Sequence, residues 1–462
     1  MKILFISANQ EKNPDLVYPI GLAYIVSASI QDGHECSVFD ANFHNDFKEP
    51  LKNILQNFHP NAIGISMRNV DNAAYPSVVS YFSHYQNLIS FCREIAPETI
   101  IILGGSAFSL FSREFMEKLK PDFGIVGEGE NAFLHLLQEI EKGKIQRKAS
   151  QTIEERIYSS EQFAYPGKFS FELDNIVSAR EILDTAIYSQ NGGSINIQTK
   201  RGCCFQCSYC NYPILEGSNV RKREPADVVD EMEYCIKKSG GKYFFFVDNV
   251  FNSAEDHAME ICKEIIRRQI KIQWTAYISP FSTSEALFSL FKESGCSSID
   301  LGVDSACELG LSVLKKPFSI QEIMDCARWC HQYKIKFNCS LIFGYPGETI
   351  QTIEECIQNI SLCQPSSVIA FIGIRLHKGV PLTISLEKSG YISEDKIGIE
   401  PIFYIEESVR EYLIQRLSTL PDQYKNWIMP GLNTQKISNA YVKRIRSKGF
   451  TGPLWELFSI KD

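Results

Sequence analysis

Short apolar runs alternate with amphipathic stretches over residues 1–140. The runs have the length of buried strands, and the stretches between them repeat apolar side chains at helical spacing. The predicted strands are residues 3–7, 35–39, 62–66, 100–103 and 123–126, and the predicted helices include residues 21–32, 77–96 and 131–142. Strands that alternate with helices in this way predict a Rossmann-like parallel sheet with helices on both faces.

A second series of the same kind begins near residue 191. Its predicted strands are residues 194–198, 243–247, 272–277, 298–302, 336–343 and 368–374, and its predicted helices include residues 225–238, 254–268, 284–294, 320–333 and 350–364. Six strand–helix units predict a partial barrel rather than a closed barrel of eight strands.

The stretch between the two series is rich in charged and polar residues and has little periodicity, which is typical of a linker. We therefore expect an α/β chain with four regions. They are a sheet domain at residues 1–141, a linker at 142–190, a partial barrel at 191–394, and a small mixed C-terminal region at 395–462 with a helix at 408–420.

The composition is that of a globular protein. The chain has 462 residues, of which 44 % are apolar and 22 % charged, and its formal net charge is −8. These values exclude a disordered chain or a coiled coil, and the acidic balance argues against nucleic acid as the main partner. The sequence has no apolar run long enough for a membrane span and no secretory signal, so we expect a cytoplasmic location.

Polar and small residues follow three strands of the first series. Ligands of parallel sheets bind at the carboxyl ends of the strands, and glycine lets the backbone approach a ligand closely. These loops therefore predict a site for a large ligand, although any one of them is also ordinary turn chemistry. The residues are Arg68, Asn69, Asp71, Gly104, Gly105, Ser106, Gly127, Glu128, Gly129 and Glu130.

Four of the 15 cysteines are clustered directly after the first strand of the second series. Cys203, Cys207 and Cys210 have the spacing C-x3-C-x2-C, and three thiolates on such a loop can bind three irons of a [4Fe–4S] cube. The fourth iron is then open to a substrate or cofactor. A tetrahedral zinc site is the alternative, but its fourth ligand would be Cys204, which adjoins Cys203, and no histidine is near. The scattered cysteines are expected to be small buried apolar residues.

This spacing, with Tyr209 just before the last cysteine, resembles the radical S-adenosylmethionine (radical SAM) superfamily. Motifs at other predicted strands agree with it, although the superfamily more often has glutamate at the position of Asp304. The resemblance implies that the open iron binds S-adenosylmethionine and that the residues of these motifs contact it. They are Tyr209, Asp248, Asn249, Asp304, Gly344 of Gly-Tyr-Pro-Gly-Glu-Thr, and Arg375.

The first domain resembles the cobalamin-binding (B12-binding) class of that superfamily. The resemblance rests on Pro19, Gly21, Gly104, Gly105, Ser109 and the Gly-Glu-Gly-Glu run at 127–130. The motif D-x-H-x-x-G, whose histidine binds cobalt from below, is absent from the sequence, and His34 and His44 are expected to be solvated loop residues. We therefore expect no histidine on the lower face of cobalt. Arg68 is expected either beneath cobalt or in an ion pair with Asp71 or another carboxylate; a guanidinium cannot itself ligate the metal.

The loop from Arg68 to Asn72 resembles the tryptophan C-methylase subgroup and its relatives in lipid and pigment pathways. The resemblance implies methylation of an unactivated or aromatic carbon of a small molecule held between the domains, with electrons from a flavodoxin or ferredoxin. Methyl transfer after hydrogen abstraction by a 5′-deoxyadenosyl radical and polar methyl transfer to an aromatic carbon both stay open. So do a rearrangement or cyclisation without methyl transfer and a cobalamin or redox sensor without catalysis. Methylthiolation of tRNA is disfavoured, because a second cysteine triad is missing from the first domain.

Overall fold

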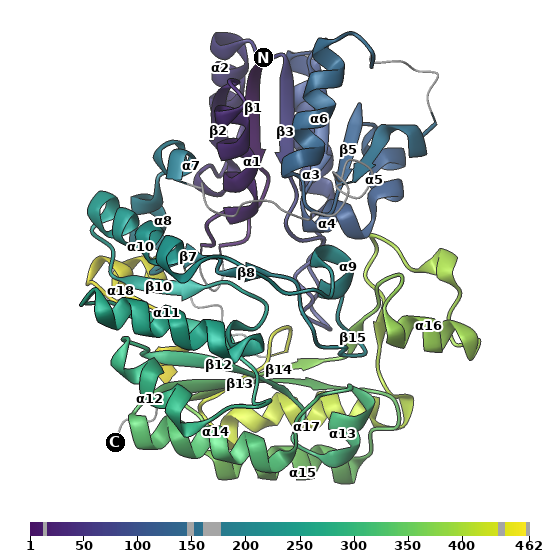
Figure 1. Ribbon diagram of the computed structural model, residues 1–462. Coiled ribbons are helices and arrows are strands. Elements are labelled where there is room, and N and C mark those ends of the chain that lie inside the picture. The colour runs from purple at the N-terminus through teal and green to yellow at the C-terminus, as the bar shows by residue number, and fades with distance from the viewer. Residues whose placement is uncertain (13–15, 146–151, 160–176, 433–438, 459–462) are drawn as a thin grey trace.

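A computed structural model describes residues 1–12, 16–145, 152–159, 177–432 and 439–458. Figure 1 shows two α/β units, one above the other, with the N-terminal third of the chain, coloured purple to blue, in the upper unit. A hairpin, a short helix and several loops lie where the units meet. Both predicted parallel sheets are present, so the α/β fold class is confirmed.

The first sheet has six parallel strands in the order β2-β1-β3-β4-β5-β6. Apolar side chains fill β1, in which all residues after Lys2 are buried. The strands are β1 Lys2–Ser7, β2 Glu35–Asp40, β3 Ala62–Ser66, β4 Ile100–Gly104, β5 Phe123–Val126 and β6 Ile157–Ser159. The helices are α1 Ile20–Gln31, α2 Lys48–Phe58, α3 Phe82–Ile95, α4 Ser106–Leu110, α5 Ser112–Leu119 and α6 Glu130–Glu141.

The predicted linker contains regular structure. Residues Ile157–Ser159 form β6, which pairs with β5 at the edge of the first sheet. Two helices, α7 Val177–Ile182 and α8 Thr185–Gly192, then lead into the second unit. A strand of three residues is too short to show a periodic pattern, which explains why the sequence did not reveal it.

The second sheet is open and has seven parallel strands in the order β17-β14-β13-β12-β11-β10-β7. Six of them match the predicted strands. The seventh, β17 Trp427–Ile428, comes from the predicted C-terminal region and pairs with β14, so that region is partly built into the barrel sheet. The other strands are β7 Ile195–Ile197, β10 Tyr243–Phe246, β11 Gln273–Ile278, β12 Ser298–Asp304, β13 Lys336–Phe343 and β14 Ser367–Ile372.

Helices cover one face of this sheet and bury its largest apolar cluster. They are α10 Pro225–Ser239, α11 Glu255–Arg267, α12 Glu285–Glu293, α13 Glu308–Val313, α14 Ile320–Tyr333, α15 Ile350–Cys363 and α17 Arg410–Gln423. The remaining elements are α9 Tyr212–Glu216, α16 Pro381–Lys388, α18 Asn439–Ser447 and two antiparallel pairs, β8 Lys200–Arg201 with β9 Arg221–Lys222 and β15 Ile374–Arg375 with β16 Phe403–Tyr404. Within the described ranges, no helix is long and apolar enough to cross a membrane.

Candidate functional site

The three loops predicted to bind a large ligand meet at one edge of the first sheet. The Ser106 hydroxyl donates a hydrogen bond to the carbonyl oxygen of Arg68 (2.7 Å), and the Gly127 N–H donates to the Ser109 hydroxyl (2.9 Å). Gly105 has a φ of +93°, and a Cβ there would lie 2.5 Å from a carbonyl oxygen of the loop after β3. Only glycine fits at this position. The loops after β3, β4 and β5 therefore form one connected rim.

The other predicted rim residues lie at the ends of elements. Pro19 is the N-cap of α1, Gly21 is exposed in its first turn, Gly104 ends β4, and Gly129 is the N-cap of α6. The carbonyl oxygen of Asn69 accepts a hydrogen bond from the buried Tyr85 hydroxyl (2.6 Å), which fixes the loop after β3.

The side chain of Arg68 is exposed and, within the described residues, forms no ion pair. Asp71, which was predicted as a possible ion-pair partner of Arg68, forms an ion pair with Arg375 of the second unit instead (Nε to Oδ2, 3.1 Å). Burial raises the pKa of Tyr212 and of Tyr277, and the positive charge of Arg68 counteracts part of that rise. The guanidinium therefore lies near both phenols of the second unit. Arg68 therefore faces the region where the two units meet.

The prediction that His34 and His44 are solvated loop residues is wrong for His34. His34 is buried rather than solvated, because its imidazole lies 3.1 Å from the N-terminal nitrogen and 3.4 Å from Asp32. His44 is half-buried and stacks on Phe39 at 4.8 Å between ring centroids.

The cysteine loop follows β8 and ends at α9. Burial raises the pKa of Cys203, Cys207 and Cys210, and the nearby Cys203 and Cys207 thiols contribute to a value of about 12 for Cys210. Cys204 is exposed, and its sulfur points to the carbonyl oxygen of Ser253 (3.9 Å). Cys203, Cys207 and Cys210 are thus mutual neighbours, whereas Cys204 influences only Cys203 among them and has its sulfur against the Ser253 carbonyl oxygen.

The loop fits an iron–sulfur cluster better than a single ion. Among the described side chains, no three His, Cys, Asp or Glu converge closely enough to hold one metal ion. In a [4Fe–4S] cube each cysteine binds a different iron, so its ligands need not converge on one point. Thiols with a raised pKa also require the charge of a metal centre to become thiolate ligands.

Asp304, predicted to contact S-adenosylmethionine, belongs to a buried polar group behind the cysteine loop. Its carboxylate accepts hydrogen bonds from the Tyr209 hydroxyl and from the Lys316 ammonium (2.6 Å). Lys316 also lies beside Cys207 and acts to lower the pKa of that thiol. Asp304 has a φ of +60°, a left-handed conformation in a residue with a side chain. This group fixes the position of the loop.

Asp248 and Asn249, after β10, also have protein partners. Both oxygens of Asp248 accept hydrogen bonds from Thr199, and the buried Lys200 ammonium forms an ion pair with Oδ2 (2.9 Å). The Asn249 amide donates to Glu216 of α9 (2.8 Å). Gly344, after β13, has a φ of +93° and donates its N–H to the buried Glu348. Their contact with a cofactor stays a prediction.

Ion pairs connect the Gly-Glu-Gly-Glu loop of the first unit to the β8–β9 hairpin of the second. Arg221 binds Glu128 through two nitrogens, one of them 2.7 Å from Oε2. Arg201, which is buried, lies 2.7 Å from Glu130 and 3.5 Å from Glu128. These carboxylates, predicted to bind cobalamin, hold the two units together in the structure.

The sequence prediction missed the aromatic and acidic side chains on the open face of the second sheet. Tyr277 at the end of β11 is 42 % exposed, and Tyr212 of α9 is 43 % exposed, although burial raises the pKa of Tyr212 to about 12. Asp300 on β12 is half-buried beside Tyr277. Polar residues that interrupt an apolar strand, as in Ile-Asp-Leu-Gly-Val-Asp at 299–304, were the available signal.

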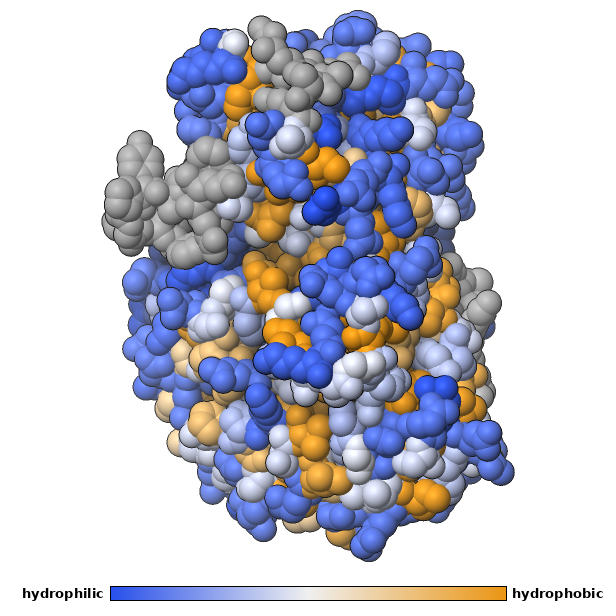
Figure 2. All heavy atoms as spheres, turned by 90° about the vertical axis from the view of Figure 1, so that its right-hand side faces the viewer, coloured by the Kyte–Doolittle hydropathy of each residue, from blue (hydrophilic) through white to orange (hydrophobic). Residues whose placement is uncertain are grey.

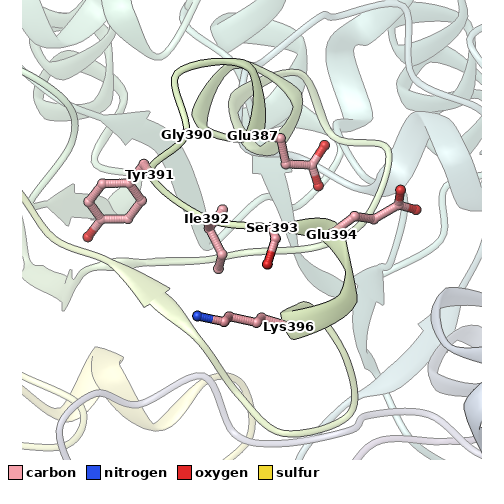
Figure 3. Close-up of a pocket in the computed structure, with 7 residues that line it drawn as sticks. All are labelled: Glu387, Gly390, Tyr391, Ile392, Ser393, Glu394 and Lys396. Carbon is pink, nitrogen blue, oxygen red and sulfur yellow. The ribbon is translucent and has the colours of Figure 1, made fainter.

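The two predicted cofactor loops lie side by side. Helix α4 follows Gly105 of the rim, helix α9 follows Cys210 of the cysteine loop, and the two helices are in contact. Figure 2 shows apolar side chains in a recess at the height where the two units meet. The pocket of about 490 Å³ in Figure 3 is elsewhere, on the turns from Glu387 to Lys396, and includes none of the predicted cofactor residues.

Comparison with known families identifies two domains. Residues 197–360 match the model of the Radical SAM superfamily, and residues 11–137 match the B12 binding domain. The first match contains the cysteine loop, and the second contains the loops after β3, β4 and β5.

Curated relatives include methyltransferases and a cyclase. A tryptophan 2-C-methyltransferase of Streptomyces laurentii is 23 % identical over 447 residues, which cover 83 % of this chain and 74 % of the relative. An anaerobic magnesium-protoporphyrin IX monomethyl ester cyclase of Rubrivivax gelatinosus is 24 % identical over 369 residues, covering 77 % of this chain and 64 % of the relative.

Among solved structures, the radical S-adenosylmethionine methyltransferase TsrM of Kitasatospora setae has the same fold. Its complex with tryptophan and a SAM analogue superposes with a TM-score of 0.83 at 20 % identity, and the match covers 99 % of this chain and 97 % of that one. The likeness extends through the C-terminal region, beyond the two family matches.

Proposed function

This chain is a radical SAM protein with a B12-binding domain, and from that premise we propose that it methylates a carbon atom of a small molecule, with S-adenosylmethionine as the methyl donor. The observation that carries the proposal is the contact between α4 and α9, which joins the rim of the first sheet to the cysteine loop. When bound, cobalamin and a [4Fe–4S] cluster supply a methyl-carrying metal and an electron-transfer centre, which side chains cannot provide. A flavodoxin or ferredoxin is the proposed source of electrons.

The chain's own residues hold and orient these groups. Cys203, Cys207 and Cys210 provide three thiolate ligands, and the small residues of the rim leave space for the corrin. Tyr212 and Tyr277 face the space between the units, where the methyl acceptor is proposed to bind. Aromatic side chains there orient an acceptor by ring contacts and exclude water from its apolar surface.

The test is an anaerobic incubation of the reconstituted protein with cobalamin, a reductant and S-adenosylmethionine labelled in its methyl group. We expect the label to appear in the cobalamin fraction, and the same reaction without protein is the control. Absence of label from cobalamin would refute the proposal. Formation of 5′-deoxyadenosine with no label transfer would favour rearrangement or cyclisation.

We further propose that Arg68 places its positive charge at the lower face of the bound cobalamin. Its side chain is exposed at the rim and has no carboxylate partner among the described residues, so replacing it should not destabilise the fold. In Arg68→His, the shorter imidazole would replace the guanidinium with a nitrogen donor on the same side of the cobalamin, and this nitrogen could bind cobalt. We expect nitrogen superhyperfine splitting in the cob(II)alamin electron paramagnetic resonance spectrum of this variant, and none in the wild type.

The matched control is Asn69→His, one residue further along the loop, which should give no splitting. The thermal midpoint of Arg68→Ala should lie within about 2 °C of the wild type, as for a surface substitution outside any ion pair. A large loss of stability in Arg68→Ala would instead indicate a structural role. Splitting in the wild type would show a nitrogen ligand on cobalt, from a histidine or from the benzimidazole of cobalamin itself, and would refute the proposal.

A further inference from the structure

The carboxylate of Asp300 lies on the open face of the second sheet. It belongs to β12, between β11 and β13, and it points away from the helices that cover the other face. Its Oδ1 accepts hydrogen bonds from the Asn338 amide (2.9 Å) and the Ser340 hydroxyl (2.8 Å), both on β13. These two donors fix the orientation of the carboxylate, and the structure records no protein donor to Oδ2 among the described residues.

Asp300 differs from the other acidic residues of this sheet in having no cation. Asp248 is paired with Lys200 and Asp304 with Lys316, whereas no described Lys, Arg or His forms an ion pair with Asp300. Asp300 is half-buried, and a carboxylate partly withdrawn from water without a counter-ion costs free energy. This burial raises the pKa of Asp300 to about 6. Two hydrogen bonds offset this cost only in part.

Aromatic rings border the carboxylate. Tyr277 is opposite Asp300 in the strand register, so both side chains leave the same face of the sheet. Phe245 of β10 packs edge-on against Tyr277, with ring centroids 5.4 Å apart. Tyr277 nevertheless stays 42 % exposed on a central strand, so solvent reaches this face. The combination is an accessible aromatic wall with one uncompensated negative charge.

We propose that Asp300 binds a protonated amine of the methyl acceptor, while Tyr277 and Phe245 contact the acceptor's aromatic body. This inference rests on the proposed function, because it takes the open face of the sheet as the acceptor site, and it adds the acceptor's chemical class. An ammonium group supplies the missing counter-ion of Asp300, and a hydrogen bond between charged partners is stronger than one between neutral groups. Cations also bind favourably to aromatic faces.

The test uses two probes with the same ring and opposite charge, tryptamine and indole-3-propionate. Each is titrated calorimetrically into the reconstituted protein with its cofactors. We expect tryptamine to bind the wild type at least about 10-fold more tightly than indole-3-propionate, and Asp300→Asn to weaken tryptamine about 10- to 100-fold, the effect of losing a charged hydrogen bond. Asp230→Asn, at an exposed ion pair on α10, is the matched control and should bind as the wild type does.

The pH dependence gives an independent readout. The groups that face Asp300 are the Tyr277 phenol on β11, the neutral Asn338 and Ser340 on β13, and Asp304 on β12, which is neutralised by Lys316. Burial raises the pKa of Tyr277, so this phenol stays protonated, and Asp300 is the group that titrates. Tryptamine affinity should therefore rise between pH 5 and pH 7.5 in the wild type and stay flat in Asp300→Asn.

Three outcomes would overturn the inference: equal tryptamine affinity in wild type and Asp300→Asn, indole-3-propionate binding as tightly as tryptamine, or no binding of either probe to the wild type. Label transfer to cobalamin is measured on the same preparation. If the label is transferred while any of these outcomes is found, the assignment of Asp300 fails and the proposed function stands. If the label is not transferred, the proposed function fails whatever the probes do.

Discussion

Replacement of Cys207 by alanine is expected to reduce bound iron from about four atoms per chain to nearly none after anaerobic reconstitution, by analogy with cubane ligation. The variant removes one of three neighbouring thiols, and a loop with two thiols cannot complete the site. Iron and sulfide analysis, with the visible absorption of the cluster, measures the effect. Transfer of the methyl label should be lost with the cluster.

Cys204→Ala is the matched control for this loss. Cys204 lies in the same loop but is exposed and turned toward Ser253, so its removal should leave the iron content unchanged. Loss of iron in Cys204→Ala would show that the wrong thiols have been assigned.

Glu231→Gln is expected to lower the free energy of unfolding by about 3–5 kcal/mol, the usual cost of breaking a buried ion pair by removing one partner. Glu231 lies on α10 and binds two buried guanidinium groups, those of Arg180 (2.6 Å) and Arg223 (2.6 Å). Arg180 also donates to the carbonyl oxygen of Asn196 on β7, the strand that leads to the cysteine loop. Without the carboxylate, the guanidinium groups of Arg180 and Arg223 stay buried between α7 and the second sheet with no counter-charge. Urea unfolding of the apoprotein measures the change.

Glu233→Gln provides the comparison on the same helix. Glu233 is exposed and pairs with Arg268, so its loss should cost less than about 1 kcal/mol. Burial opposes ionisation of Glu231, but the two guanidinium groups outweigh it and hold the pKa of Glu231 below its usual value. A lowered pKa in the folded state contributes stability that is full above the unfolded pKa of 4.5 and is lost as the pH falls below it. Equal costs for the two variants would contradict this account.

Regular periodic elements were predictable from the sequence, and short ones were not. The strands of β3 and β13 and the helix α14 have the predicted bounds, because each is long enough for its apolar pattern to be read. The strands β6 and β17 have three and two residues, and each exists because it pairs with the edge of a sheet formed by other residues. Such pairing depends on tertiary structure and leaves little trace in a local pattern.

The same distinction holds for the candidate site: its local motifs were predictable from the sequence, and its contacts between distant residues were not. The cysteine spacing and the glycines of the rim are local features, and the structure groups both as the sequence suggested. Partners distant in sequence were not predictable: Asp71 lies beside Arg375, and Glu128 lies beside Arg221. With the exception of Arg68, the charged residues chosen as cofactor contacts therefore have charged or polar partners in the fold. Asp300, which forms no ion pair with the described residues, was not among the predicted site residues.

The ion pairs of Glu128 and Glu130 affect how the two domains can be altered or exchanged without disturbing their arrangement. They connect the rim loop to a hairpin whose strands flank the cysteine loop, so the spacing of the two cofactor loops is set by a few neighbouring side chains. That spacing then depends more on these side chains than on the length of the chain that connects the two domains. Exchange of one domain with a relative therefore needs the acidic loop and the basic hairpin to be transplanted together. The acidic loop and the basic hairpin thus form one contact that belongs to both domains.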